Sequence, residues 1–198
     1  MTDTTRAPSA RQGELLDAAY RYVLTHGLAD LSLRPLAAAI GSSPRVLLFL
    51  FGSKDGLVRE LLARARRDEL AMLTTLRGSP SGRDAVDGLP SAIRVTWRWL
   101  AEATHRPLLM LWCEAYARSL IEPDGAWADF ARQTIDDWLL VLADAQTPVR
   151  RRTRTGLAER TLALAVLRGA LLDLLATGDI ERTTAAVERH LATTRRTP

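Results

Sequence analysis

The apolar residues of segment 31–57 recur at three- and four-residue spacing, which predicts helices rather than strands. A first short helix follows Ser32, a candidate N-cap, and should end at Gly41, because glycine commonly stands just past a helix end. A serine and a proline, which favour the N-cap and the first helical position, open a second helix of roughly residues 44–50. Gly52 should end this second helix.

A third, longer helix is predicted directly after that glycine. Ser53 is its candidate N-cap, and the helical spacing of apolar residues continues from Lys54 to about Leu76. Two short helices joined by a tight glycine turn form a helix-turn-helix unit, whose second helix enters the major groove of DNA. The same spacing, from residue 9 or 10 to His26, predicts an earlier helix that supports this pair.

The rest of the chain is predicted to be entirely helical. A Gly-, Ser- and Pro-rich linker is expected at residues 78–90, and a polar surface loop at residues 146–154. Further helices are expected at roughly residues 90–104, 107–120, 126–145, 156–176 and 179–194. We therefore predict an all-α chain of about nine helices, divided into an N-terminal helix-turn-helix domain (1–53), a connecting helix (54–77) and a C-terminal helical domain (78–198).

Composition narrows the class of protein. The 198 residues are 47% hydrophobic and 25% charged, which is ordinary for a globular protein with a sizeable core. No apolar run reaches the roughly 20 residues of a membrane span, and the first ten residues are too polar for a signal peptide. A single cysteine, Cys113, excludes an internal disulfide framework. These features predict a cytoplasmic protein.

The positive charge of the chain is concentrated near its beginning. The formal net charge is +4, and residues 1–67 hold ten Lys or Arg residues against six acidic ones, whereas the remainder holds 17 of each. The excess of basic residues therefore lies in the segment with the helix-turn-helix pattern, as contact with the DNA phosphates requires.

Several motifs of this segment resemble those of one protein family. Residues 41–43 (Gly-Ser-Ser) and 51–57 (Phe-Gly-Ser-Lys-Asp-Gly-Leu) resemble the DNA-binding signature of TetR-type (TetR/AcrR) transcriptional regulators. The preceding Leu-Leu-Asp-Ala-Ala at 15–19, His-Gly at 26–27 and Leu-Ser-Leu at 31–33 fit the same signature. The resemblance covers about residues 11–62 and implies a DNA-binding domain followed by a domain that binds a small effector and forms a dimer.

Two positions differ from the family pattern. The family usually has an aromatic hydroxyl where this chain has Leu48, and often a histidine or similar polar residue where it has Leu50. Both positions commonly contact DNA phosphates in the family. Because Leu48, Phe49 and Leu50 are three neighbouring apolar residues on one short helix, they cannot all face the core. At least one of them is expected at the DNA, touching a thymine methyl or a sugar.

The candidate DNA-contacting residues lie on and around the second short helix. Arginine can bind guanine or phosphate, and the resemblance implies a phosphate contact for the lysine that opens the long helix. A solvated surface charge is the alternative for each cation, and helix capping is the alternative for the serine. The candidates are Arg34, Ser43, Pro44, Arg45, Val46, Leu48, Phe49 and Lys54.

A second candidate site lies in the middle of the chain, where all five tryptophans fall between residues 97 and 138. An apolar effector pocket and plain core packing are the two interpretations of this cluster. Glu114, Arg118 and Arg168 are its possible polar anchors or, alternatively, members of surface ion pairs. The candidate effector-binding residues are Trp97, Leu100, Met110, Trp112, Cys113, Tyr116 and Trp138.

The resemblance also implies that the last two helices of each subunit pair across a two-fold axis. Large and small residues alternate on the first of these helices, which permits close helix approach. The candidate interface residues are Leu164, Ala165, Arg168, Leu172, Val187 and Leu191. A two-fold dimer would present two recognition helices to a palindromic DNA site.

No pattern of an enzyme is present. The sequence has no Gly-x-Ser-x-Gly motif, phosphate loop or dinucleotide fingerprint, and its three histidines show no metal-ligand spacing with Cys113. We therefore predict no catalytic residue, cofactor or metal site. The preferred hypothesis is a dimeric repressor that an apolar or aromatic effector releases from a double-stranded DNA operator. The alternative is an interaction or ligand-sequestering module that keeps this fold but binds DNA weakly.

Overall fold

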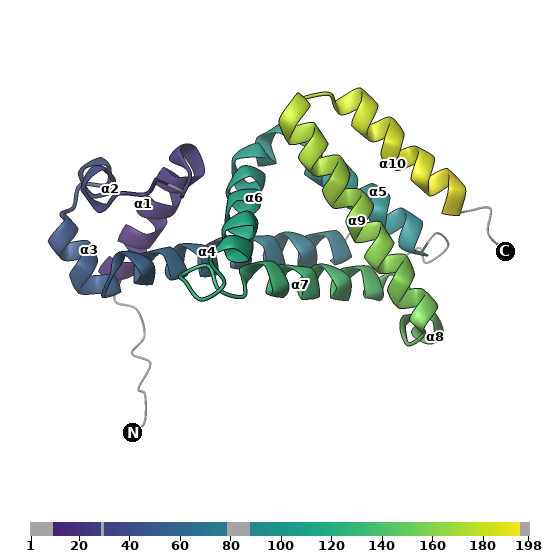
Figure 1. The fold of residues 1–198 in the computed structure, drawn as a ribbon, viewed down its shortest axis with the longest axis horizontal. Coiled ribbons are helices and arrows are strands. Elements are labelled where there is room, and N and C mark those ends of the chain that lie inside the picture. Colours follow the sequence, from purple (N-terminus) through teal and green to yellow (C-terminus); the bar gives the residue numbers. More distant parts are fainter. Residues whose placement is uncertain (1–9, 29, 79–87, 195–198) are drawn as a thin grey trace, which may run out of the picture. The chain divides into compact units, whose positions relative to one another are not determined.

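The computed structural model describes residues 10–28, 30–78 and 88–194, and within these ranges it contains ten α-helices, one short 3-10 helix and no strand (Figure 1). This confirms the predicted all-α fold class. The helices are α1 (Ala10–His26), α2 (Leu33–Ala39), α3 (Pro44–Phe51), α4 (Lys54–Gly78), α5 (Gly88–Leu100), η2 (Ala103–His105), α6 (Arg106–Ile121), α7 (Phe130–Asp144), α8 (Pro148–Arg151), α9 (Arg154–Thr177) and α10 (Ile180–Thr194).

The chain divides into two compact units. Unit 1 comprises Met1–Arg67 and Met110–Ala131, and unit 2 comprises Asp68–Leu109 and Arg132–Pro198. Unit 1 therefore combines α1 to α3 and the first half of α4 with most of α6. The predicted boundaries at residues 53 and 77 remain a prediction, and most of the predicted linker lies outside the described residues.

The core of unit 1 is one apolar cluster. It gathers Val23 of α1, Leu36 of α2, Leu47 of α3 and Leu61 of α4, and α6 adds Leu111 to the same cluster. A polar contact joins the same elements: the Leu28 N–H, just after α1, donates to Glu114 Oε2 of α6 at 2.8 Å. The helix-turn-helix pair is thus supported by a helix that lies about 60 residues later in the chain.

The caps of the short helices follow largely from the local sequence. Ser43 Oγ accepts the N–H of Val46 at 3.3 Å, and Ser53 Oγ accepts the N–H of Gly56 at 2.9 Å, so both predicted caps are confirmed. Gly52 ends α3 with φ 75°, a left-handed conformation that glycine adopts without a Cβ clash. Ser32 stands at the N-cap position of α2, but its side chain makes no cap hydrogen bond.

Unit 2 is organised around the packing of α5, α9 and α10. The buried Ile93, Trp97 and Leu100 form the inner face of α5. Trp97 Nε1 donates to Thr184 Oγ1 of α10 at 3.0 Å, which satisfies the polar atom of this buried side chain. This hydrogen bond fixes α5 against α10.

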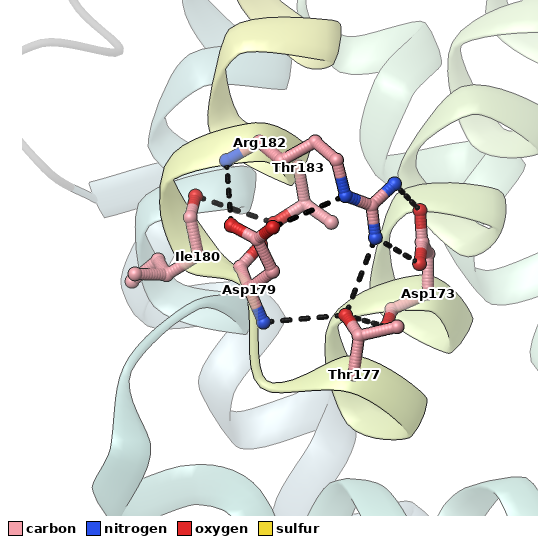
Figure 2. A network of polar contacts seen from close by, with 6 residues as sticks. All are labelled: Asp173, Thr177, Asp179, Ile180, Arg182 and Thr183. Atoms are coloured by element: carbon pink, nitrogen blue, oxygen red, sulfur yellow. Dashed lines mark hydrogen bonds and ion pairs between the residues drawn. The ribbon is translucent and has the colours of Figure 1, made fainter.

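A polar network holds the corner between α9 and α10 (Figure 2). The Arg182 guanidinium donates to both Asp173 carboxylate oxygens, at 2.6 and 2.7 Å, and Nε donates to Asp179 at 3.2 Å. Asp179 also accepts the backbone N–H of Arg182, so it caps α10. The hydrogen bond from Arg182 lowers the pKa of the Asp173 carboxyl below its ordinary value. These polar contacts therefore hold the end of α9 and the start of α10 together at their short connection.

Some element boundaries differ from the prediction. α7 begins at Phe130 rather than near residue 126, because Asp129 has φ 63° and interrupts the helical conformation. α5 ends at Leu100, four residues early. The segment 146–154, expected to be a loop, contains the short helix α8. Gln146, the first residue of this segment, is buried, and its side-chain amide donates to the Gly156 carbonyl oxygen at 2.9 Å.

In the described residues no single helix has both the length and the apolar character needed to cross a membrane. Only α2 and α3 taken together meet that test, and the chain bends by 103° between them.

Candidate nucleic-acid interface

The orientation of α3 is set by its two buried residues, Leu47 and Phe51, which belong to the core of unit 1. Because an α-helix turns by about 100° per residue, Phe49 lies about 180° from the midline between these two side chains. Phe49 is accordingly 86% exposed, and Val46 and Leu48 on either side of it are 39% and 43% exposed. Of the consecutive apolar residues Leu48, Phe49 and Leu50, at least one was predicted to face away from the core, and Leu48 and Phe49 both do so.

Three exposed cations lie on α3 and on the two helices next to it in the chain. Arg34 of α2, Arg45 of α3 and Lys54 at the start of α4 are all exposed. Among the described residues none of them forms an ion pair, unlike Arg11, which pairs with Glu14, and Arg64, which pairs with Asp17. The three charges are therefore available to anions outside the protein.

The remaining two DNA-binding candidates, Ser43 and Pro44, stabilise the start of α3. The exposed Ser43 hydroxyl accepts the Val46 N–H at the start of α3, and Pro44 is half-buried at the first helical position. α3 is further held at its other end, where Gln12 Nε2 of α1 donates to the Leu50 carbonyl oxygen at 3.3 Å. These contacts keep the outward face of α3 fixed within unit 1.

The candidate effector-binding residues are divided between the two units. Trp97, Leu100 and Trp138 are buried in unit 2. On α6 in unit 1, Met110 is exposed, whereas Trp112, Cys113 and Tyr116 are half-buried. The rings of Trp112 and Tyr116 lie one helical turn apart, with centroids 5.3 Å from each other. The candidate effector-binding residues thus belong to two different units of the chain.

Trp138 has a buried acidic partner that the sequence analysis missed. Its Nε1 donates to Glu69 Oε1 of α4 at 2.5 Å, and the Glu69 side chain is buried. No local signal distinguished this carboxylate, because it follows several arginines and another acid on a long helix, as a solvated acid would. Burial of a carboxylate is costly unless hydrogen bonds accompany it, and the indole supplies one.

The three suggested polar anchors have different partners. Glu114 binds the backbone of Leu28 within unit 1, and Arg118 forms an ion pair with Glu122 one turn along α6, at 2.7 Å. Arg118 is therefore a surface ion-pair residue, the alternative left open above. Arg168 is half-buried on α9.

Apart from the half-buried Arg168, the candidate dimer residues fall into two groups, buried and exposed. Leu164, Val187 and Leu191 are buried within the chain's own unit 2, so they are core residues in this structure and are not available to a partner. The helical spacing of apolar residues could not predict this burial, because it does not tell which apolar face of a helix packs against the core of its own chain. Ala165 and Leu172 are exposed. They belong to a stripe of small or apolar exposed residues at alternating four- and three-residue spacing on α9: Ala158, Leu162, Ala165, Gly169, Leu172 and Ala176.

Neither the histidines nor the acidic residues gather into a metal site in the part of the chain that the structure describes. The His26 ring stacks on Tyr22, and its Nδ1 lies 2.9 Å from the Tyr22 carbonyl oxygen. The His105 ring likewise stacks on Trp99, with its Nδ1 2.8 Å from the Trp99 carbonyl oxygen. Both imidazoles thus have local structural partners.

Comparison with known proteins connects these observations. Residues 15–61 match the family model described as bacterial regulatory proteins, tetR family. The multidrug binding protein EbrR, solved in complex with imidazole, is similar in structure with a TM-score of 0.68 and 26% identity, over 100% of this chain and 97% of that one. A TetR family member from Streptomyces coelicolor A3 has a TM-score of 0.68 and 27% identity, with coverage of 96% and 99%. None of the curated proteins matches this chain.

The fold and the matched segment define the class: the chain is a helix-turn-helix DNA-binding protein of all-α architecture. Residues 15–61 match the tetR family of bacterial regulatory proteins, as the motifs around residues 41–57 predicted, and the chain as a whole has the fold of solved TetR-type regulators.

The environment of Cys113 on α6 gives a first testable expectation. Burial raises the pKa of the Cys113 thiol to about 11, because an apolar environment disfavours the charged thiolate. Since the thiolate is the reactive form, the native protein at pH 8 should hold about 100-fold less reactive thiolate than an ordinary cysteine. We expect Cys113 to react with a disulfide reagent such as DTNB much more slowly in the native chain than in the urea-unfolded chain. Equal rates in the two states would contradict this.

Proposed function

We propose that this regulator is a repressor that binds a palindromic operator as a homodimer and is released by a small apolar or aromatic effector. The observation that carries the proposal is the outward face of α3 with its exposed Arg45, together with the exposed cations Arg34 of α2 and Lys54 of α4; none of the three forms an ion pair among the described residues. A recognition helix fixed by its buried side and flanked by available cations suits the major groove and its phosphates.

The exposed stripe on α9 supports a dimer. Its spacing of four and three residues is that of a helix-packing seam, and the small side chains of Ala165 and Gly169 permit close approach of a second helix. Leu162 and Leu172 supply apolar surface that is exposed in the single chain. We propose this stripe, rather than the buried Leu164, as the surface that α9 offers to a second copy.

The effector part of the proposal rests on the aromatic residues. Structures of EbrR, which share 25–26% identity with this chain, are described as complexes with imidazole, proflavin and malachite green. In this chain we propose that an effector of similar apolar, aromatic character contacts Trp112 and Tyr116 on α6. Such a ligand releases DNA only if it binds the DNA-incompetent arrangement more tightly than the DNA-bound one. The protein therefore acts by binding, with no chemical step.

One observation favours the alternative function. Leu48 lies exposed on α3 where the family usually has an aromatic hydroxyl, so this position offers no hydrogen bond to a phosphate. If the surrounding cations do not compensate, the chain is an interaction or ligand-sequestering module rather than an operator-binding repressor.

Salt dependence tests the DNA-binding function directly. If Arg34, Arg45 and Lys54 of both subunits contact phosphates, the logarithm of the binding constant should fall with the logarithm of salt concentration with a slope of about −5. Lys54→Ala should weaken binding and make the slope shallower by about 2, since a dimer loses two contacts. Gel shifts with genomic fragments over a salt series measure both.

Arg154→Ala is the matched control, because Arg154 is an exposed cation at the start of α9 in the other unit. It should leave the slope unchanged. A small aromatic compound that binds the free protein by calorimetry should release the retarded fragment. If the native chain retards no fragment even at low salt, the repressor proposal fails and the sequestering module is favoured.

Ala165→Glu tests the dimer. A carboxylate placed at the centre of the α9 stripe would be buried without a partner in the dimer, which costs about 3–5 kcal/mol. Sedimentation should show a dimer for the native chain at micromolar concentration and a monomer for the variant. Ala117→Glu, the same change at an exposed alanine of α6, should remain dimeric. A native monomer, or a variant that dimerises as the native chain does, would refute the proposed interface.

Leu48→Tyr tests the role of the missing hydroxyl. A hydrogen bond to a charged group contributes about 1.5–3 kcal/mol, so two per dimer should tighten binding about 100-fold or more. The gain should apply to specific and non-specific DNA alike, because phosphate contacts carry no sequence information. Leu48→Phe is the matched control, since it adds the ring without the hydroxyl and should give no such gain.

Melting temperature separates the two accounts of Leu48. Because this side chain is 43% exposed, tyrosine should fit without lowering stability. Weaker binding together with a lower melting temperature would instead show that Leu48 supports the helix from within and that tyrosine overpacks it.

A further inference from the structure

The outward face of α3 carries very little hydrogen-bonding chemistry. Arg45 is the only charged residue among the eight of this helix, and the other outward side chains, Val46, Leu48 and Phe49, are all apolar. The Ser43 hydroxyl just before the helix already accepts the Val46 N–H. Hydrogen-bond reading of base edges by this helix is therefore limited to a single guanidinium.

The exposed apolar surface is too concentrated to be incidental. Single exposed apolar residues are normal on a protein surface, but a contiguous group marks an interaction site. Phe49 presents most of its ring to solvent at the point of α3 farthest from the core, with Val46 and Leu48 on its two sides. The same helix and its two neighbours in the chain, α2 and α4, carry the exposed cations Arg45, Arg34 and Lys54, so charge complementarity favours a polyanion as the occupant.

An apolar side chain can distinguish bases in the major groove in one main way. Thymine carries a C5 methyl group there, whereas the other three bases present only hydrogen-bonding edges at the corresponding positions. We propose, on the basis of the function proposed above, that Phe49 is a specificity-determining residue that reads thymine through this methyl group. Arg45 supplies the polar contact of the same helix.

This assignment predicts how the operator is read. Burial of one methyl group is worth about fourfold in affinity, so loss of one thymine methyl in each half-site should weaken dimer binding by roughly 15-fold. The recognition of thymine by Phe49 involves no hydrogen bond. Cytosine in place of the contacted thymine should therefore weaken binding, and 5-methylcytosine should recover most of the loss.

The test uses the full-length native protein and a duplex that it selects from a random-sequence pool. The duplex is synthesised with thymidine or with deoxyuridine in the half-sites, a change that removes only methyl groups. The native chain should bind the thymidine form roughly 15-fold more tightly, and Phe49→Ala should bind both forms equally. Because Phe49 is exposed, its removal should leave the melting temperature unchanged, which verifies that the variant is folded.

Lys54→Ala is the matched control, because a phosphate contact contributes equally to both forms. This variant should bind both duplexes less tightly and keep the native preference for thymidine. Equal binding of the two forms by the native chain would overturn the inference while the DNA-binding function stands, and so would a thymidine preference that persists in Phe49→Ala. If no duplex is enriched from the pool, the proposed function itself fails, and the inference falls with it.

Discussion

The burial of Leu47 and Phe51 is the constraint on which the DNA-binding unit depends. α3 has only eight residues, so these two side chains in the core of unit 1 fix the rotation of the helix about its own axis. Once that rotation is fixed, Arg45 and Phe49 must face outward, since the helical period leaves them no other side. The caps by Ser43 and Gly52 fix where the helix begins and ends, and together these contacts make the outward surface a defined one.

Unit 1 is completed by a segment that the chain reaches only much later. Leu111 and Ala115 of α6 close the apolar cluster, and Glu114 between them accepts the Leu28 N–H. An uncompensated buried amide is costly, so this carboxylate holds the connection between α1 and α2 in place. The helix-turn-helix pair therefore depends on a helix beyond the segment that carries the family motifs.

The features that the sequence predicted correctly are those governed by neighbours in the chain. Ser43 and Ser53 cap helices through contacts within three residues, and Gly52 ends α3 through its own φ angle. Features decided by distant contacts were not predictable. The helical period places Val187 on an apolar face, but only the fold shows that Val187 is buried within its own chain. Similarly, Glu69 looks like a solvated acid until the fold places it beside the Trp138 indole.

The long-range packing of α6 in unit 1 also limits how an effector can act. Trp112, Cys113 and Tyr116 share one helix with Leu111 and Ala115, and within unit 1 the latter two are part of the core that also holds Leu47. A ligand that prefers a shifted position of α6 must therefore repack this core or break the bond between Glu114 and Leu28. Because packed cores change between discrete arrangements rather than deform gradually, such a ligand acts by shifting the equilibrium between two arrangements of this core. The coupling free energy is limited by the difference in ligand affinity between the two arrangements, not by the tightness of binding.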